Sequence, residues 1–183
     1  SENTSANGVS IDSVTLKDGT ITSTVADNSD NLTLISTDAD ANVGPNLNLY
    51  RNSSSPADDD VLGLVIYNGQ NDNDETIIYA RQVSYIKDAS DGTEDGQLTF
   101  QTMVAGTIRD RLNITPSEIV LNEDSVDLDF RVETNNESNA FFVEAGTDEV
   151  GFFTANPSRK VHVVNSSADL YGFGLSSTAS SGN

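Results

Sequence analysis

Residues 76–87, TIIYARQVSYIK, decide the fold class of this chain. Successive side chains of a β-strand point to opposite faces, so Ile77, Tyr79, Val83 and Tyr85 share one face and Ile78, Ala80 and Ile86 the other. Ile, Val, Tyr and Thr are poor helix formers, and no capping residue precedes them. The stretch therefore predicts a strand that is covered on both sides.

Further short strands are predicted on either side of this one, because β-branched and aromatic clusters alternate with turns rich in Asp, Asn, Ser and Gly. No segment has the period of an amphipathic helix of three turns. The predicted strands lie at 9–16, 20–25, 31–36, 47–51, 61–69, 97–104, 107–115, 118–122, 128–133, 140–145, 149–153 and 159–164.

The composition excludes several function classes. The chain has 183 residues and carries 29 Asp and Glu against 9 Lys and Arg, a net charge of −20, so it lacks the basic surface that binds nucleic acid or an anionic membrane. The sequence contains no run of about 18 apolar residues, which is the pattern that indicates membrane insertion. With no Cys and one His, thiolate metal sites, cysteine nucleophiles and a histidine-rich zinc site are excluded. We expect no cofactor and no enzymatic activity.

The pattern divides the chain into four regions. Residues 1–45 read as an N-terminal β-repeat or attachment region, 46–115 as a compact β domain, 116–164 as a further β module and 165–183 as a Ser/Gly-rich linker or frayed end. Only 36% of the residues are hydrophobic, so the core is expected to be thin and self-association to cover open strand edges.

One acidic cluster is similar to the start of a calcium-binding loop. Asp38, Asp40 and Asn42 stand at alternate positions, as the first ligands of such a loop do. However, Val43 occupies the place of the required glycine, and Gly44 comes one position late. The cluster is interpreted as a solvated turn.

Two more acidic groups are candidate sites. Asp72, Asp74 and Glu75 form an oxygen-rich turn with the same interpretation. Asp127 and Asp129, if both lie on a strand, point to one face about 7 Å apart, which is the spacing of the carboxylates in inverting glycosidases. Carboxylates at this density produce such pairs by chance, so both are expected to be surface groups and no catalytic or metal site is assigned.

The remaining chemistry-bearing residues have structural interpretations. His162 stands between Val161 and Val163 on a predicted strand, so its side chain points away from theirs and is expected at a surface or an interface. Four arginines fall in or beside predicted strands. Each either pairs with a carboxylate, some of them across chains, or covers apolar surface with its stem: Arg81, Arg109, Arg111 and Arg131.

Segment 128–164 resembles a module of bacteriophage tail-fibre and other virion fibre proteins, particularly of marine and cyanobacterial phages. The module contains a D-F-R-V-E strand, an L/F-F-V-D/E-A strand, a V-G-I-G/F turn, an S-P-S or N-P-S turn and a K-L/V-H-V strand in this order. The matching residues are 129–133, 141–145, 150–153, 156–158 and 160–163, and the similarity extends upstream to about residue 47. This chain departs from the pattern at Phe152-Phe153, where a glycine-containing sequence is more usual.

The resemblance implies an all-β fold of short strands in an elongated, intertwined homotrimeric fibre with a small sandwich-like or prism-like region. It implies a non-enzymatic virion component that supports host adsorption, with other virion proteins and a host surface glycan or receptor as partners. Three alternatives stay open at this point: a capsid-decorating or head-fibre protein, a glycan-depolymerising tailspike, and an extracellular filament or adhesin subunit.

Overall fold

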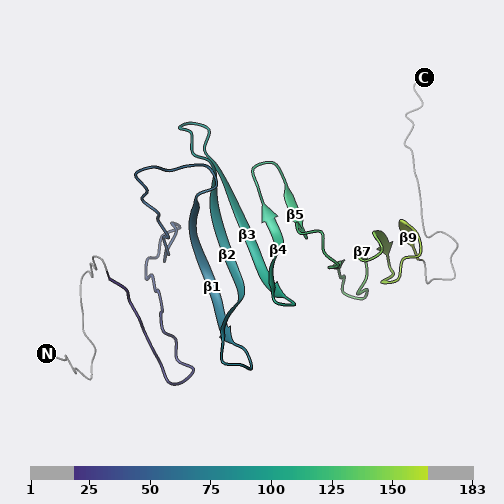
Figure 1. Ribbon diagram of the computed structural model, residues 1–183, viewed down its shortest axis with the longest axis horizontal. Coiled ribbons are helices and arrows are strands. Elements are labelled where there is room, and N and C mark those ends of the chain that lie inside the picture. The colour runs from purple at the N-terminus through teal and green to yellow at the C-terminus, as the bar shows by residue number, and fades with distance from the viewer. Residues whose placement is uncertain (1–18, 165–183) are drawn as a thin grey trace. The chain divides into compact units, whose positions relative to one another are not determined.

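A computed structural model describes residues 19–164 of the chain (Figure 1). Every regular element within this range is a β-strand, which confirms the all-β class. The chain divides into two units, residues 1–48 and 49–183, which are described separately. The described part of the first unit contains no strand, and both β-sheets belong to the second unit.

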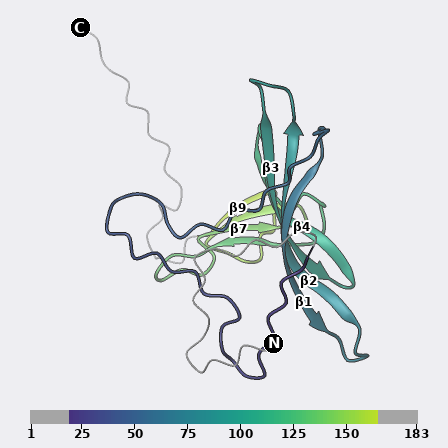
Figure 2. The same ribbon diagram turned by 90° about the vertical axis from the view of Figure 1, so that its left-hand side faces the viewer.

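The first sheet has five antiparallel strands in chain order, which Figure 1 shows side by side and Figure 2 shows turned by 90°. Each strand pairs with the next one along the chain, so the sheet is a meander. The predicted strand at 76–87 is confirmed and lies second in the sheet, between two long neighbours. The five strands are β1 (Val61–Gln70), β2 (Thr76–Asp88), β3 (Asp95–Val104), β4 (Thr107–Ile114) and β5 (Ile119–Leu121).

Local turn chemistry connects these strands. The Asn71 side chain accepts hydrogen bonds from the backbone N–H groups of Asn73 and Glu75, at 3.0 and 2.9 Å, and closes the β1–β2 turn. Between β3 and β4 the chain reverses over Ala105 and Gly106, both with positive φ (45° and 79°), as a two-residue hairpin requires. The turn at Ala105 is thus made without a glycine or asparagine at its first position.

One face of the five-stranded sheet carries a ladder of polar side chains. The register aligns Val83 with Thr99 and Thr99 with Asn113 across three strands, and these small central side chains are buried. Beside them, the Arg81 guanidinium donates to Gln101, and the amides of Gln101 and Asn113 both donate to the Asp110 carboxylate. We call this connected group, Arg81, Gln101, Asp110 and Asn113, the polar ladder.

The opposite face of the same sheet is mainly aliphatic and aromatic. Two cross-strand rows run through it, in which Leu98 aligns with Ile114 and Phe100 with Leu112. Neither row contains a charged side chain. We call this surface the Leu/Ile face; its apolar members on β3 to β5 are Leu98, Phe100, Leu112, Ile114, Ile119 and Leu121.

The second sheet has four short strands in the order β6-β7-β8-β9. The first three are antiparallel, whereas β9 runs parallel to β8 after the connection through residues 153–160. All four of these strands fall within the segment that resembles the fibre module. Their bounds are β6 (Phe130–Val132), β7 (Phe141–Glu144), β8 (Glu149–Phe152) and β9 (Val161–Val163).

The two faces of the second sheet differ in character. One face consists only of Phe and Val side chains and includes two edge-to-face aromatic pairs, Phe130–Phe141 at 6.1 Å and Phe141–Phe152 at 5.3 Å between ring centroids. We call it the Phe/Val face; register and alternation place on it Phe130, Val132, Phe141, Val143, Val150, Phe152, Val161 and Val163.

The other face is covered by the chain's own 153–160 loop. The loop passes so close to Gly151 that a Cβ there would lie 2.5 Å from the Thr154 carbonyl oxygen. Further along, the Ser158 N–H donates to His162 Nδ1 at 3.3 Å. Phe142, which pairs with Gly151, is buried on this side. The turn into the loop holds Phe153 at φ 61°, in the left-handed region that glycine adopts most readily.

One expectation from the sequence needs correction. The strands predicted at 20–25, 31–36 and 47–51 are absent, because no neighbouring strand completes their hydrogen bonds; the one at 9–16 lies outside the described residues. Residues 118–122, assigned to the 116–164 module, supply β5 and pair with β4. The main strand contacts within the described residues are made inside each sheet.

Candidate functional site

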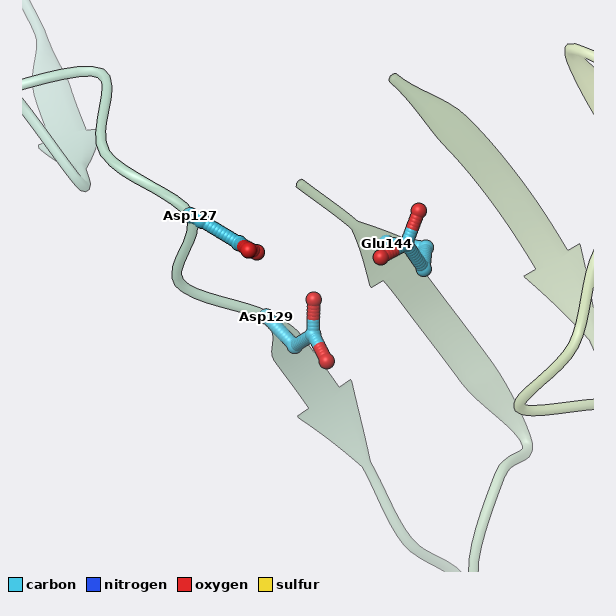
Figure 3. Close-up of side chains that lie close together, drawn as sticks. All are labelled: Asp127, Asp129 and Glu144. Atoms are coloured by element: carbon cyan, nitrogen blue, oxygen red, sulfur yellow. The ribbon is translucent and has the colours of Figure 1, made fainter. Parts of the chain in front are cut away.

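Three carboxylates meet beside the first strand of the four-stranded sheet, and Figure 3 shows their side chains converging. Asp127 lies in the loop before β6, Asp129 directly precedes β6, and Glu144 ends β7. One oxygen of each lies within 4.8 Å of the others. Asp127 is not on a strand, so the predicted strand spacing of about 7 Å does not apply to this pair.

Strand register brings Glu144 to the two aspartates. Phe130 pairs with Val143 in the antiparallel β6–β7 ladder, and one step further along this register Asp129 faces Glu144. Gly146 allows the approach, because a Cβ there would lie 3.1 Å from both Asp127 Oδ1 and Glu144 Oε1. The sequence predicted the aspartate pair as surface groups and missed Glu144, whose position depends on the length of the β6–β7 connection.

Hydrogen bonds offset part of the repulsion between these carboxylates. The Ala145 N–H donates to Asp129 Oδ1 at 3.0 Å, and the Thr147 N–H donates to Glu144 Oε2 at 2.7 Å. The Thr147 hydroxyl also donates to Glu144, and this bond is the main reason why the pKa of Glu144 lies below its ordinary value. Glu144 is therefore held in its charged form at neutral pH.

The cluster borders a polar hollow of about 410 Å³, formed together with the 153–160 loop and lined by Asp129, Glu144, Thr147, Ala155, Asn156 and Pro157. Three converging carboxylate oxygens are the type of ligand that hard divalent cations take. Glycoside hydrolysis instead needs one carboxyl group with a raised pKa as general acid. The lowered pKa of Glu144 does not suit this residue to that acid role.

The other acidic groups form hydrogen-bonded turns. The Asp40 N–H donates to Asp38 Oδ1 at 3.2 Å, and the Asn42 N–H donates to Asp40 Oδ1 at 2.8 Å. These bonds fold residues 38–42 into successive Asx turns, which are exposed. Asp72, Asp74 and Glu75 lie in the β1–β2 turn, where Glu75 accepts from the Asn71 amide at 2.7 Å.

Two of the four arginines pair with carboxylates, as one of the two expectations has it, and the other two have neutral partners. Arg109 lies 3.9 Å from Asp124, and Arg131 lies 2.6 Å from Glu133, so these two pair with carboxylates of the same chain. Arg81 and Arg111 instead donate to neutral side chains, Gln101 and Thr102. His162 lies on β9 on the side opposite Val161 and Val163, as predicted.

The largest unexplained feature is the apolar surface. The apolar side chains that are fully buried in the described residues are Val83 and Phe142, whereas Ile119 on the Leu/Ile face is 71% exposed and Val161 on the Phe/Val face is 63% exposed. The two faces meet at a hollow of about 310 Å³, whose lining includes Leu121, Leu128, Phe130 and Val143. Exposed apolar patches of this extent mark interaction surfaces.

Comparison with protein-family models and with curated proteins found no match to this chain. The described residues also contain no helix of the length and apolar character that crossing a bilayer requires.

Proposed function

We propose that this chain is a non-enzymatic structural subunit of a homotrimeric β-fibre in a bacteriophage particle, where it supports host adsorption. The observation that carries the proposal is the mismatch between buried and exposed apolar side chains in the second unit. With Val83 and Phe142 as the fully buried apolar residues of the described chain, an isolated copy removes little apolar surface from water.

The resemblance to fibre proteins supplies the virion context. Its separate pieces fall on β6, β7, β8, the following turn and β9, so they build one four-stranded sheet. This agreement between sequence order and one structural unit supports treating residues 128–164 as a module.

Light scattering with in-line chromatography tests the assembly. We expect about three times the chain mass of 19.5 kDa, and a stable monomer would contradict the proposal. Antibody labelling of phage particles in electron micrographs tests the location: label on tail fibres supports adsorption, label over the capsid favours the head-fibre alternative, and unlabelled particles contradict a virion role.

The tailspike alternative rests on the three converging carboxylates. An assay of polysaccharide cleavage by the wild type and by the double variant Asp127→Asn/Asp129→Asn tests it. We expect neither protein to cleave host polysaccharide and both to assemble equally. Cleavage by the wild type that disappears in the double variant would replace the structural proposal by an enzymatic one.

A further inference from the structure

The Phe/Val face separates charge from apolar surface within one small sheet. All eight of its members are Phe or Val, whereas Arg131, Glu144, Glu149 and His162 alternate with them and lie on the opposite face. The carboxylate cluster of Asp127, Asp129 and Glu144 lies beside that opposite face. An amphipathic sheet of this kind is stable when its apolar face is covered.

The chain's own 153–160 loop covers the charged face of this sheet and not the Phe/Val face. The 153–160 loop lies over the charged side of the sheet, at Gly151 and His162. On the Phe/Val face, Val132 remains 43% exposed and Val161 63% exposed. The described part of the chain thus leaves the more apolar of the two faces in contact with water.

The size of the surface matches a stable protein interface once both apolar faces are counted. Four strands of three or four residues present about 200 Å² on one side, from strand spacings of about 4.8 Å and rises of about 3.3 Å. The same estimate gives about 700 Å² for the Leu/Ile face of the five-stranded sheet. The sum is about 900 Å² per copy, within the range of an interface of standard size.

Charge decides what occupies this surface. Each copy has a net charge of −20, so two copies approach most easily through faces that carry no carboxylate. A basic foreign partner would instead be attracted to the acidic faces. A second copy offers a surface of the same size whose two apolar rows on the five-stranded sheet carry no charged side chain, and it is available wherever the chain itself is present.

Building on the proposed homotrimer, we infer that copies of this chain contact one another through the Phe/Val face together with the Leu/Ile face. Glu144, on the opposite face of the sheet, is then turned away from the contact between copies, whereas Asp129 lines the hollow at its edge.

Two neighbouring residues provide a matched test. Val132 lies on the Phe/Val face, and Arg131, the residue before it, lies on the charged face and pairs with Glu133. We expect Val132→Asp to weaken association at least tenfold, measured as the concentration at which light scattering shows dissociation. Arg131→Asp adds more negative charge yet is expected to leave association within twofold of the wild type. Equal effects of the two variants would overturn the inference.

Thiol labelling covers the case in which Val132→Asp does not fold. Because the chain has no Cys, the single variants Val161→Cys and Arg131→Cys each carry one reactive group. In the assembled protein, an alkylating reagent should label Val161→Cys at least tenfold more slowly than Arg131→Cys, and dissociation should remove the difference. Similar labelling rates in an assembled protein would refute this interface but not the proposed trimer. A monomeric wild type would refute the proposed function itself.

Discussion

Gly151 is the residue at which the four-stranded sheet tolerates least change. Its missing side chain leaves room for the backbone of the 153–160 loop, and an added Cβ would lie 2.5 Å from the Thr154 carbonyl oxygen. Since a backbone atom has to move, the loop loses its close contact with the side of the sheet that buries Phe142.

We therefore expect Gly151→Ala to destabilise the protein by about 1–3 kcal/mol, as overpacking does. Gly96 in β3 provides the control, because a Cβ there would find its nearest neighbour at an ordinary 3.8 Å. Urea unfolding of Gly151→Ala and Gly96→Ala measures both effects. A Gly151→Ala variant as stable as Gly96→Ala would contradict the described loop position.

The lowered pKa of Glu144 gives a pH prediction. A carboxyl group whose pKa is lowered in the folded state contributes stability above its ordinary value of 4.5, and the contribution is lost as pH falls through the folded-state pKa. Thr147→Val removes the hydroxyl that is the main cause of the shift. The melting temperature of this variant should fall less steeply between about pH 5 and about pH 3 than that of the wild type.

Titration of the Glu144 carboxyl group by NMR checks the cause directly. The expected result is a higher midpoint in Thr147→Val than in the wild type, while Asp88, whose pKa is lowered by its bonds to Ser90, should titrate identically in both proteins. An unchanged Glu144 midpoint would show that the hydroxyl bond is not the cause.

The carboxylate cluster shows the limit of sequence reasoning at this scale. Asp127 and Asp129 are close in sequence, and their proximity could be predicted from that alone. Glu144 joins them because Phe130 pairs with Val143, and the β6–β7 connection that sets this register gives no turn signal of fixed length. A displacement of one residue would move Glu144 to the opposite face.

Among the structural elements, the polar ladder links three neighbouring strands. The Asp110 carboxylate on β4 accepts a hydrogen bond from the Gln101 amide on β3. It accepts a second one from the Asn113 amide on its own strand, with 3.2 Å between Asn113 Nδ2 and Asp110 Oδ2. Asn113 is buried, with 4% of its surface exposed, so its amide has no ready access to water as a replacement partner.

We expect Asp110→Ala to reduce the free energy of unfolding by about 1–3 kcal/mol, because two amide groups lose their acceptor. Asp72→Ala in the exposed β1–β2 turn should change it by less than about 0.5 kcal/mol. Denaturant unfolding monitored by circular dichroism measures both variants. A loss at Asp110 no larger than that at Asp72 would mean that the ladder does not stabilise the sheet.

The strand elements could be predicted where two conditions were met together. Residues 76–87 alternate apolar side chains and have long neighbouring strands, and there the prediction is confirmed. Residues 20–25, 31–36 and 47–51 alternate as well, but they have no partner strand within the described chain, and Ile21, Ile35 and Tyr50 are largely exposed. Alternation indicates an extended backbone, whereas strand pairing depends on the rest of the assembly.

At the scale of the whole molecule, net charge opposes the proposed assembly. Three copies carry a formal charge of −60, three times the −20 of one chain. Dissolved salt screens repulsion between charges further apart than about 10 Å at 0.1 M ionic strength. The trimer should therefore become more stable as sodium chloride is added.

A series of melting curves from low salt to about 0.5 M sodium chloride, well past the ionic strength at which the Debye length falls below about 8 Å, measures this effect. Parallel samples with magnesium or calcium chloride at matched ionic strength separate screening from specific cation binding. A melting temperature that falls with sodium chloride would mean that ion pairs such as Arg131–Glu133 contribute more than the net repulsion.

The scarcity of buried apolar side chains also has a calorimetric consequence. Globular proteins gain about 12–15 cal/mol/K per residue in heat capacity on unfolding, mostly from the hydration of newly exposed apolar groups. With Val83 and Phe142 as the fully buried apolar residues of the described chain, a dissociated copy should unfold with a distinctly smaller increment. Most of the heat-capacity change should accompany dissociation, so the calorimetric transition should move to higher temperature as protein concentration rises. A transition that is independent of protein concentration and has the heat-capacity change of an ordinary globular protein would mean that a single chain buries its apolar surface by itself.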